Sequence, residues 1–262
     1  MRFGANFERD GFALCAHDAK IAAWAEAANA VADAILADPV EQNTWLRHGK
    51  TWFVGVDSLP NEANGAVRGV PLAGGVIEAL QAIPELWPST LHRAQLSVCY
   101  PGYPLQDPDE SDANHGFRRN RDAAHLDGLL LEGPERRRYL KEPHGVILGL
   151  PLNQIDPKAS PLVVWRGSHH IIAKAFRAAL EGHASETWAE IDVTDIYQAA
   201  RREVFETCER VELPGQPGEA SVLHRHVIHG VAPWEEGVPG QDRRIAYFRP
   251  HLKDYAQWLA LP

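Results

Sequence analysis

Cysteine and long apolar runs are both scarce in this sequence. The 262 residues contain 3 cysteines, Cys15, Cys99 and Cys208, whose odd number and unpaired spacing argue against a disulfide framework and a zinc knuckle. No apolar run approaches the roughly 18 residues that cross a bilayer. The N-terminal residues also lack the basic and apolar segments of a secretory leader. We therefore expect reduced thiols, no membrane partner and a cytoplasmic location.

An excess of basic residues is missing as well. The formal net charge is -9, which disfavours non-specific binding to nucleic acid and leaves small molecules as the expected partners. A hydrophobic fraction of 45% in a chain of this length suffices for one large core. We expect a single domain over residues 1–262, with a helical insertion at about 170–207.

Apolar patterns predict a chain that is mainly β. Ile21, Trp24, Ala28 and Val31 recur at helical spacing after Asp18, which predicts one long helix that ends near residue 39. Short helices are expected at 75–83, 171–180 and 196–205. Strands are expected at 11–15, 51–57, 91–100, 145–152, 161–165, 208–213, 220–224 and 244–249. Residues 101–121 show no periodicity, which predicts a long loop that acts as a lid or a binding segment.

Two possible metal ligands stand one residue apart at His125 and Asp127. Side chains alternate along an extended segment, so these two point the same way, and His229 on a distant strand adds a second imidazole. Two His and one carboxylate leave positions open on a divalent metal, which suits non-haem Fe(II) that binds a co-substrate and dioxygen. The adjacent pair His169 and His170 is a weaker candidate, because no carboxylate stands beside it.

Other polar residues are candidates for contacts with ligands. Gln95 lies on the polar side of the strand at 91–100, and in a barrel that encloses a ligand this side lines the pocket. The alternative is that Gln95 faces solvent. Arginines gather at 118–121 and 136–138, where they meet an anionic substrate or form solvated charge runs.

The order of motifs resembles the phytanoyl-CoA dioxygenase family of Fe(II)/2-oxoglutarate-dependent oxygenases. The resemblance covers about residues 5–250 and rests on four motifs in order, followed by an arginine in a strand. The motifs are Asp10-Gly-Phe, His125-x-Asp127, Pro161-Leu-Val-Val-Trp-Arg-Gly-Ser-His169 and Gly218-Glu-Ala-Ser-Val-Leu-His-x4-His229-Gly. It implies a mainly β fold with flanking helices and a double-stranded β-helix core, the jelly roll of cupin-like proteins, with the metal at one open end.

The resemblance also implies the ligands of the iron. By position these are His125, Asp127 and His229. The family commonly has another histidine five residues before the distal ligand, and His224 occupies that place. This spacing favours His229 over His226 and leaves His224 and His226 as structural residues.

A family arginine beyond the distal histidine pairs with the far carboxylate of 2-oxoglutarate. Both Arg243 and Arg244 fit this position, and a planar guanidinium suits a carboxylate because it donates two parallel charge-assisted bonds. The residues after Arg244 match the family's strand pattern better, and strand parity allows only one of the pair to point inward. Arg244 is therefore favoured over Arg243.

The implied activity is hydroxylation of a small-molecule substrate with Fe(II), 2-oxoglutarate and O2, releasing succinate and CO2. Because Asp127 fills the position that halogenases leave open for chloride, hydroxylation is favoured over halogenation. Two alternatives stay open: a metal-binding jelly-roll protein without oxygenase turnover, and a zinc hydrolase on a cupin-like barrel. The arginine discriminates between them, since a hydrolase needs no buried partner for a carboxylate.

Overall fold

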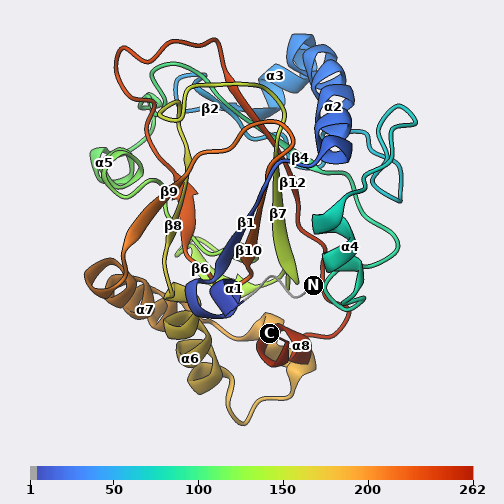
Figure 1. The fold of residues 1–262 in the computed structure, drawn as a ribbon. Helices are drawn as coiled ribbons and strands as arrows, with labels where there is room; N and C mark the ends of the chain where they lie inside the picture. The colour runs from blue at the N-terminus through green and yellow to red at the C-terminus, as the bar shows by residue number, and fades with distance from the viewer. Residues whose placement is uncertain (1–4, 262) are drawn as a thin grey trace.

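The computed structural model describes residues 5–261, in which antiparallel strands form two facing sheets with helices outside them (Figure 1). The strands of the larger sheet are β1 (Phe12–Cys15), β2 (Leu46–Arg47), β3 (Trp52–Phe53), β4 (Gln95–Cys99), β7 (Val146–Pro151), β10 (Ala220–His224) and β12 (Arg243–Phe248). Those of the smaller sheet are β8 (Leu162–Trp165), β9 (Arg210–Leu213) and β11 (His229–Val231), and β5 (Leu129–Glu132) pairs only with β6 (Arg137–Leu140). The larger sheet has the order β1-β10-β7-β12-β4-β3-β2 and the smaller β11-β8-β9. The predicted jelly-roll class is confirmed.

The core between the two sheets is built from alternate residues of each strand. Ile147 and Leu223 of the larger sheet pack against Leu162 and Val164 of the smaller one. Side chains along a strand point alternately to its two faces, so these residues share the inner face. Each fully buried aliphatic side chain contributes about 1.5–3 kcal/mol to folding. All six residues of β7 are buried, because helices cover its outer face as well.

The long helix α2 (Ala19–Ala37) covers the outer face of the larger sheet, as the sequence predicts (Figure 1). Asp18 caps it, since its Oδ1 accepts a hydrogen bond of 2.8 Å from the backbone N–H of Lys20. The fully buried Trp24 packs against Phe248 of β12 and donates its indole N–H to the carbonyl of Gly65. The helix therefore holds the outer side of the strand that carries the late arginines.

Three helical segments stand between β8 and β9 and cover the outer face of the smaller sheet. These are α6 (Ser168–Leu180), the 3-10 helix η1 (Ser185–Glu190) and α7 (Thr194–Thr207). The remaining helices are α1 (Ala5–Asp10), α3 (Pro39–Trp45), α4 (Gly75–Gln81), α5 (Asp112–Asn120) and α8 (Ala256–Ala260). None of the helices in the described part of the chain combines the length and apolar character needed to cross a membrane.

The prediction of an unstructured loop at 101–121 is wrong in its second half, where α5 forms. Ser111 caps this helix by accepting the backbone N–H of Asn114 at 3.3 Å. No residue of α5 is buried, so the helix has no apolar stripe that periodicity could detect.

Candidate metal centre

The segment that carries His125 is paired directly with the start of β11. The backbone N–H of His125 donates to the carbonyl of His229 at 2.8 Å, and the N–H of His229 donates back at 3.1 Å. Residues directly opposite each other in an antiparallel pair bring their side chains together. The two imidazole rings accordingly lie with their centroids 4.7 Å apart.

Backbone carbonyls orient both imidazoles in the same way. His125 Nδ1 lies 3.0 Å from the carbonyl oxygen of Ala123, and His229 Nδ1 lies 3.1 Å from that of Val227. A carbonyl oxygen only accepts, so each Nδ1 carries a proton, and in the neutral imidazole of His229 this leaves a lone pair on Nε2. This is the arrangement by which proteins aim histidine at a metal.

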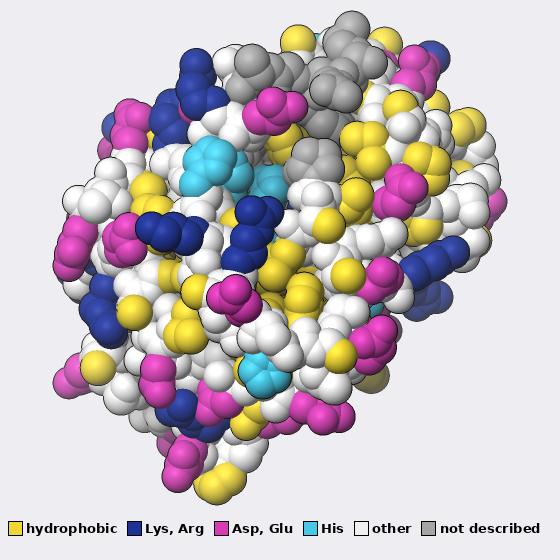
Figure 2. All heavy atoms as spheres, turned by 90° about the horizontal axis from the view of Figure 1, so that it is seen from below, with side chains coloured by type: hydrophobic (Ala, Val, Ile, Leu, Met, Phe, Trp, Pro, Cys, Tyr) yellow, Lys and Arg dark blue, Asp and Glu magenta, His cyan; other side chains and the backbone are white. Residues whose placement is uncertain are grey.

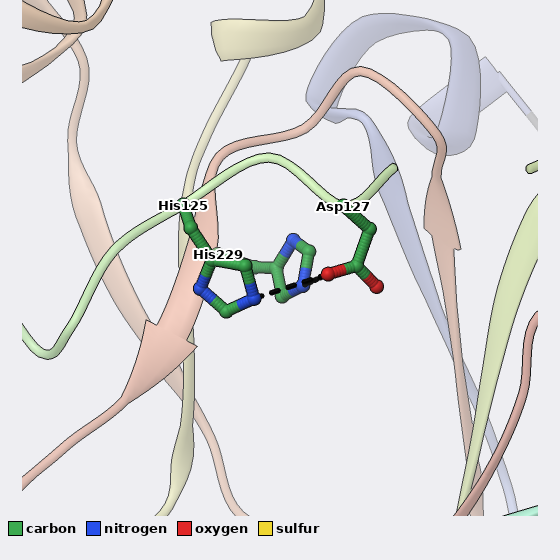
Figure 3. A group of neighbouring side chains, drawn as sticks. All are labelled: His125, Asp127 and His229. Atoms are coloured by element: carbon green, nitrogen blue, oxygen red, sulfur yellow. Dashed lines mark ion pairs between the residues drawn. The ribbon is translucent and has the colours of Figure 1, made fainter. Parts of the chain in front are cut away.

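Asp127 completes the group, and Figure 3 shows its carboxylate turned toward the two imidazoles. Its Oδ1 lies 3.0 Å from His125 Nε2 and 3.7 Å from His229 Nε2. The donor atoms of the three residues all lie within 4.8 Å of one another. Bonds of about 2.1 Å at right angles around a metal place neighbouring donors about 3.0 Å apart. The three predicted ligands therefore converge, and small adjustments suffice to place them on one face of an ion.

Charge and burial set the protonation of the group. Burial acts to raise the pKa of Asp127, but Arg249, His229 and His125 outweigh it and hold that pKa well below the usual range. Arg249 Nη1 lies 3.3 Å from Asp127 Oδ2. Burial lowers the pKa of His229 to about 4, so this imidazole is neutral at pH 7. For His125, burial lowers the pKa, yet the hydrogen bond and charge of Asp127 outweigh it and raise the pKa above its ordinary value.

A cavity of about 190 Å³ adjoins the three ligands within the space between the sheets. Gln95 and Ser97 of β4 line it, together with Trp52, Tyr247 and Arg249. Gln95 donates its amide to the carbonyl of Val54 at 2.8 Å, and Trp52 donates its indole N–H to Ser97 Oγ at 3.0 Å. The structure thus places Gln95 beside the ligands rather than in solvent, and the cavity has a polar wall next to the metal donors.

The two late arginines lie on opposite faces of β12, and the favoured one points away from the ligands. Arg244 bonds to Asp242 and reaches Asn29 and Asp33 of α2, so its guanidinium lies on the outer face of the sheet. Arg243 shares the inner face with Tyr247 and lines a neighbouring cavity of about 320 Å³. As expected for neighbouring residues of a strand, only one of the two arginines points inward. That residue is Arg243 and not Arg244.

No protein-family model matches the sequence, and the search of curated proteins gave no match. Several solved structures are similar in fold. EctD from S. alaskensis, crystallised with 2-oxoglutarate and 5-hydroxyectoine, is 16% identical, with 94% of this chain and 73% of EctD covered and a TM-score of 0.45. AviO1 from Streptomyces viridochromogenes Tue57 is 15% identical, with 94% of this chain and 92% of AviO1 covered and a TM-score of 0.46. The epimerase SnoN, in complex with Fe3+, alpha ketoglutarate and nogalamycin RO, is 15% identical. The match covers 94% of this chain and 81% of SnoN, with a TM-score of 0.46. The fold of the present chain is assigned from its own strand pairing.

Arg249 is the site residue that the sequence analysis missed. It follows β12 directly and continues the inner row of that strand after Arg243, Ile245 and Tyr247. The sequence did hold a signal for Arg249, because alternate residues of a strand share one face and Arg249 is the next residue on the inward face.

The other histidines considered as ligands gather at a different cavity, of about 380 Å³. Its lining includes His169, His170, His224 and His226, with Lys174 and Arg177. The face seen in Figure 2 has histidine and basic side chains grouped near one another. His169 Nε2 lies 3.1 Å from the carbonyl of Glu8, so it is tied to α1. The structure does not bring these four histidines to Asp127.

Three arginines of the two loops are engaged by neighbouring acidic or aromatic groups. Arg118 pairs with Glu110, and Arg137 pairs with Asp192 and Asp195. Arg138 lies over the ring of Tyr197 at 5.3 Å. None of these arginines is among the described residues that line the cavity beside the ligands.

Proposed function

We propose that this chain is a non-haem Fe(II)- and 2-oxoglutarate-dependent oxygenase that hydroxylates a small molecule. The observation that carries the proposal is the convergence of His125, Asp127 and His229 beside a polar cavity between two sheets. Two imidazoles and one carboxylate match Fe(II) that keeps positions open for other ligands. Bound there, Fe(II) would supply the oxidising chemistry, with 2-oxoglutarate and O2 consumed and succinate and CO2 released.

The protein's own groups are prepared for such an ion. Both imidazoles turn Nε2 toward Asp127, because both Nδ1 atoms already face carbonyl oxygens, and an incoming metal ion would replace the contact of His125 Nε2 with Asp127. Asp127 stays ionised and supplies one negative charge to the metal, and Arg249 fixes its second oxygen. Because Asp127 fills the third protein position, hydroxylation is favoured over halogenation.

Arg243 is our candidate for the far carboxylate of 2-oxoglutarate. Its side chain is buried, and its Nη1 has no hydrogen-bond partner among residues 5–261. Cys99 lies beside it, but burial raises the pKa of this thiol to about 11, so the thiol supplies no counter-charge. An uncompensated buried cation costs several kcal/mol, and an incoming carboxylate removes this cost. Tyr247 and Leu162 line both the cavity of Arg243 and the cavity of the ligands, so the two cavities adjoin.

Other cavity residues orient ligands and exclude water. Gln95 and Ser97 present polar groups to the co-substrate, whereas Val54 and Ile147 keep the cavity apolar on other sides. A substrate carboxylate or phosphate would meet Arg249, because Arg249 lines the cavity and the loop arginines do not. A cavity of about 190 Å³ suits a small metabolite.

Turnover and binding of 2-oxoglutarate test the proposal together. Metal-free protein is loaded with Fe(II) without oxygen, and 2-oxoglutarate is titrated while the visible charge-transfer absorption of the chelate is followed. Oxygen is then admitted and succinate is measured against a panel of acidic and neutral metabolites. We expect both signals in the wild-type protein and neither in the double variant His125→Ala/His229→Ala, which removes two of the three ligands.

Variants of the two late arginines sharpen the test. Arg243→Gln should weaken 2-oxoglutarate binding at least tenfold, the effect of losing about 1.4 kcal/mol, whereas Arg244→Gln should leave it unchanged. If instead 2-oxoglutarate fails to bind wild-type protein and the Zn2+ form hydrolyses a test ester, the zinc hydrolase is the better assignment. Metal binding without either activity would favour the non-catalytic jelly-roll protein.

A further inference from the structure

A second group of metal-ligating side chains lies on the far side of Arg249. Glu142, His144 and His251 place one donor atom each within 4.8 Å of one another. The segments that carry them run antiparallel, since the N–H of Gly145 donates to the carbonyl of Pro250 at 2.8 Å and His144 is paired with His251. The rings of the two histidines lie with their centroids 4.8 Å apart. We call Glu142, His144 and His251 the outer cluster.

His144 is oriented and left only partly satisfied in a way that implies a ligand. Its side chain is 4% exposed. Its Nδ1 lies 3.0 Å from the carbonyl oxygen of Arg249, which places the proton on Nδ1 and the lone pair on Nε2. Within residues 5–261, Nε2 is buried and makes no hydrogen bond. The nearest charged atom is Glu142 Oε2 at 3.4 Å, which is an ion-pair separation without hydrogen-bond geometry, so Nε2 is only partly satisfied.

We propose that the outer cluster binds a divalent metal ion of the Zn2+ class, separate from the ion held by His125, Asp127 and His229. His144 Nε2 and Glu142 Oε2 are 3.4 Å apart. Bonds of about 2.0–2.1 Å in tetrahedral geometry place two donors about 3.3–3.4 Å apart, so this pair already has the separation the ion requires. His251 is exposed, which gives the ion an entry path and a fourth position for water.

His92 is a neighbour of the outer cluster but not a fourth ligand. Its ring lies 5.8 Å from that of His251, measured between centroids. Both of its nitrogens are engaged: Nδ1 lies 3.0 Å from Asp57 Oδ1, and Nε2 lies 3.0 Å from the carbonyl of Arg249. His92 is therefore a matched control, because it touches the same carbonyl as His144 and the same ring as His251.

The ion would brace the two segments that position the main ligands. Gly128, next to Asp127, accepts hydrogen bonds from the N–H groups of Lys141 and Glu142 at 3.0 and 3.2 Å. His251 stands two residues after Arg249, whose guanidinium holds Asp127. A bond from the metal to Glu142 and another to His251 would thus link the chain behind Asp127 to the chain behind Arg249. The role of the outer cluster is structural support of the first site.

Titration with Co2+ of the chelator-treated full chain tests the proposal. Four-coordinate Co2+ absorbs visible light strongly and six-coordinate Co2+ weakly, so the two sites are distinguishable by spectrum as well as by stoichiometry. We expect the double variant His125→Ala/His229→Ala to retain one strongly absorbing Co2+ ion per chain. Adding Glu142→Gln or His251→Asn should abolish that signal, whereas adding His92→Ala should preserve it.

The choice of variants guards against misfolding. Glu142 is half-buried and His251 exposed, so substitutions there spare the core, and far-ultraviolet circular dichroism verifies the fold of each variant. If the double variant binds no Co2+, or binds it equally well after Glu142→Gln and His251→Asn, the outer cluster is not a metal site. Neither result depends on oxygenase turnover, so the proposed function stands or falls separately.

Discussion

The main site and the outer cluster are built on the same plan but open to different surroundings. Each has a carboxylate and a histidine two residues apart, and a second histidine paired with the first across an antiparallel bridge. In both, a carbonyl holds Nδ1 of the first histidine. The main site lines a cavity of about 190 Å³, whereas His251 of the outer cluster is exposed to solvent. The two histidines and the carboxylate therefore determine which metal can bind. The presence or absence of a cavity beside them determines whether a substrate can react there.

Arg249 joins the two groups and belongs to both. Its guanidinium lies 3.3 Å from Asp127 of the main site, and its carbonyl accepts from His144 of the outer cluster. Side-chain substitutions of Arg249 leave that carbonyl in place. The two groups can consequently be perturbed one at a time.

The largest expected effect comes from substitution of the carboxylate ligand in each of the two groups. Asp127→Ala removes the carboxylate of the main site, so Fe(II) binding there should weaken and hydroxylating turnover with 2-oxoglutarate should be lost. Glu142→Gln should instead leave turnover within a few fold and remove the outer ion. Metal content by mass spectrometry and succinate release, measured on both variants, check this crossed pattern. Loss of turnover in both variants alike would mean that the groups act as one site.

The next effect is on stability and concerns the partner of Asp127. Arg249→Gln leaves a carboxylate that is only 9% exposed without its cation, which should destabilise the metal-free protein by about 2–3 kcal/mol. The depressed pKa of Asp127 means that its charge stabilises the fold above about pH 3.9 and that this contribution is lost as the pH falls through the folded pKa. With Arg249 gone, the folded pKa rises and the acid dependence becomes shallower.

Urea unfolding of the metal-free protein at pH 7 and at about pH 2.5, below the unfolded pKa of an aspartate, measures this difference. Arg249→Lys keeps a positive charge and should recover part of the stability. Equal stability of the wild-type and Arg249→Gln proteins at pH 7 would show that the pair contributes nothing.

The sequence predicts those parts of the fold whose interactions are local along the chain. The helix α2 and the strand β7 were predictable, because an apolar stripe or a continuous apolar run records which faces are covered. The helix α5 has no fully buried residue, and β3 is only two residues long because Gly55, with φ +47°, ends the extended run. Neither feature leaves a trace in apolar periodicity.

The main site was predictable in part for the same reason. His125 and Asp127 are near neighbours in sequence, and the motif order pointed to His229. The orientation of Arg243 and Arg244 depends on the register of β12 against β4, where Arg243 is opposite Cys99 and Arg244 opposite Val98. One residue of register reverses both side chains, and a single sequence does not record that register. The outer cluster shows a similar two-residue spacing, but nothing in the chain linked Glu142 and His144 to His251.

A third expected effect comes from a substitution that disrupts the backbone pairing at the main site but not at the outer cluster. A Cβ added at Gly230 would lie 2.1 Å from the carbonyl oxygen of Asp122, which forces β11 away from the segment that carries His125. Gly230→Ala should cost about 1–3 kcal/mol and weaken metal binding at the main site, while the outer cluster keeps its ion. Gly75→Ala is the control, because its nearest atom lies at 4.0 Å. Isothermal titration with Fe(II) substitutes and thermal unfolding check both effects, and unchanged metal affinity in Gly230→Ala would rule out the pairing as its cause.

The smallest effect concerns an ion pair that anchors the same segment from outside. Arg210 of β9 donates to both oxygens of the buried Asp122 at 2.7 and 2.9 Å. Because Arg210 is 39% exposed, Arg210→Ala should cost only about 1–2 kcal/mol, with a modest loss of metal affinity at the main site. Arg166 is the control: it is 37% exposed and pairs with the buried Asp10 at 2.9 Å, which Arg9 also holds. Arg166→Ala should lower stability by a smaller amount, because Arg9 still pairs with Asp10, and should leave metal affinity unchanged. Losses of affinity in proportion to the losses of stability in both variants would trace the effect to global stability rather than to the Asp122 anchor.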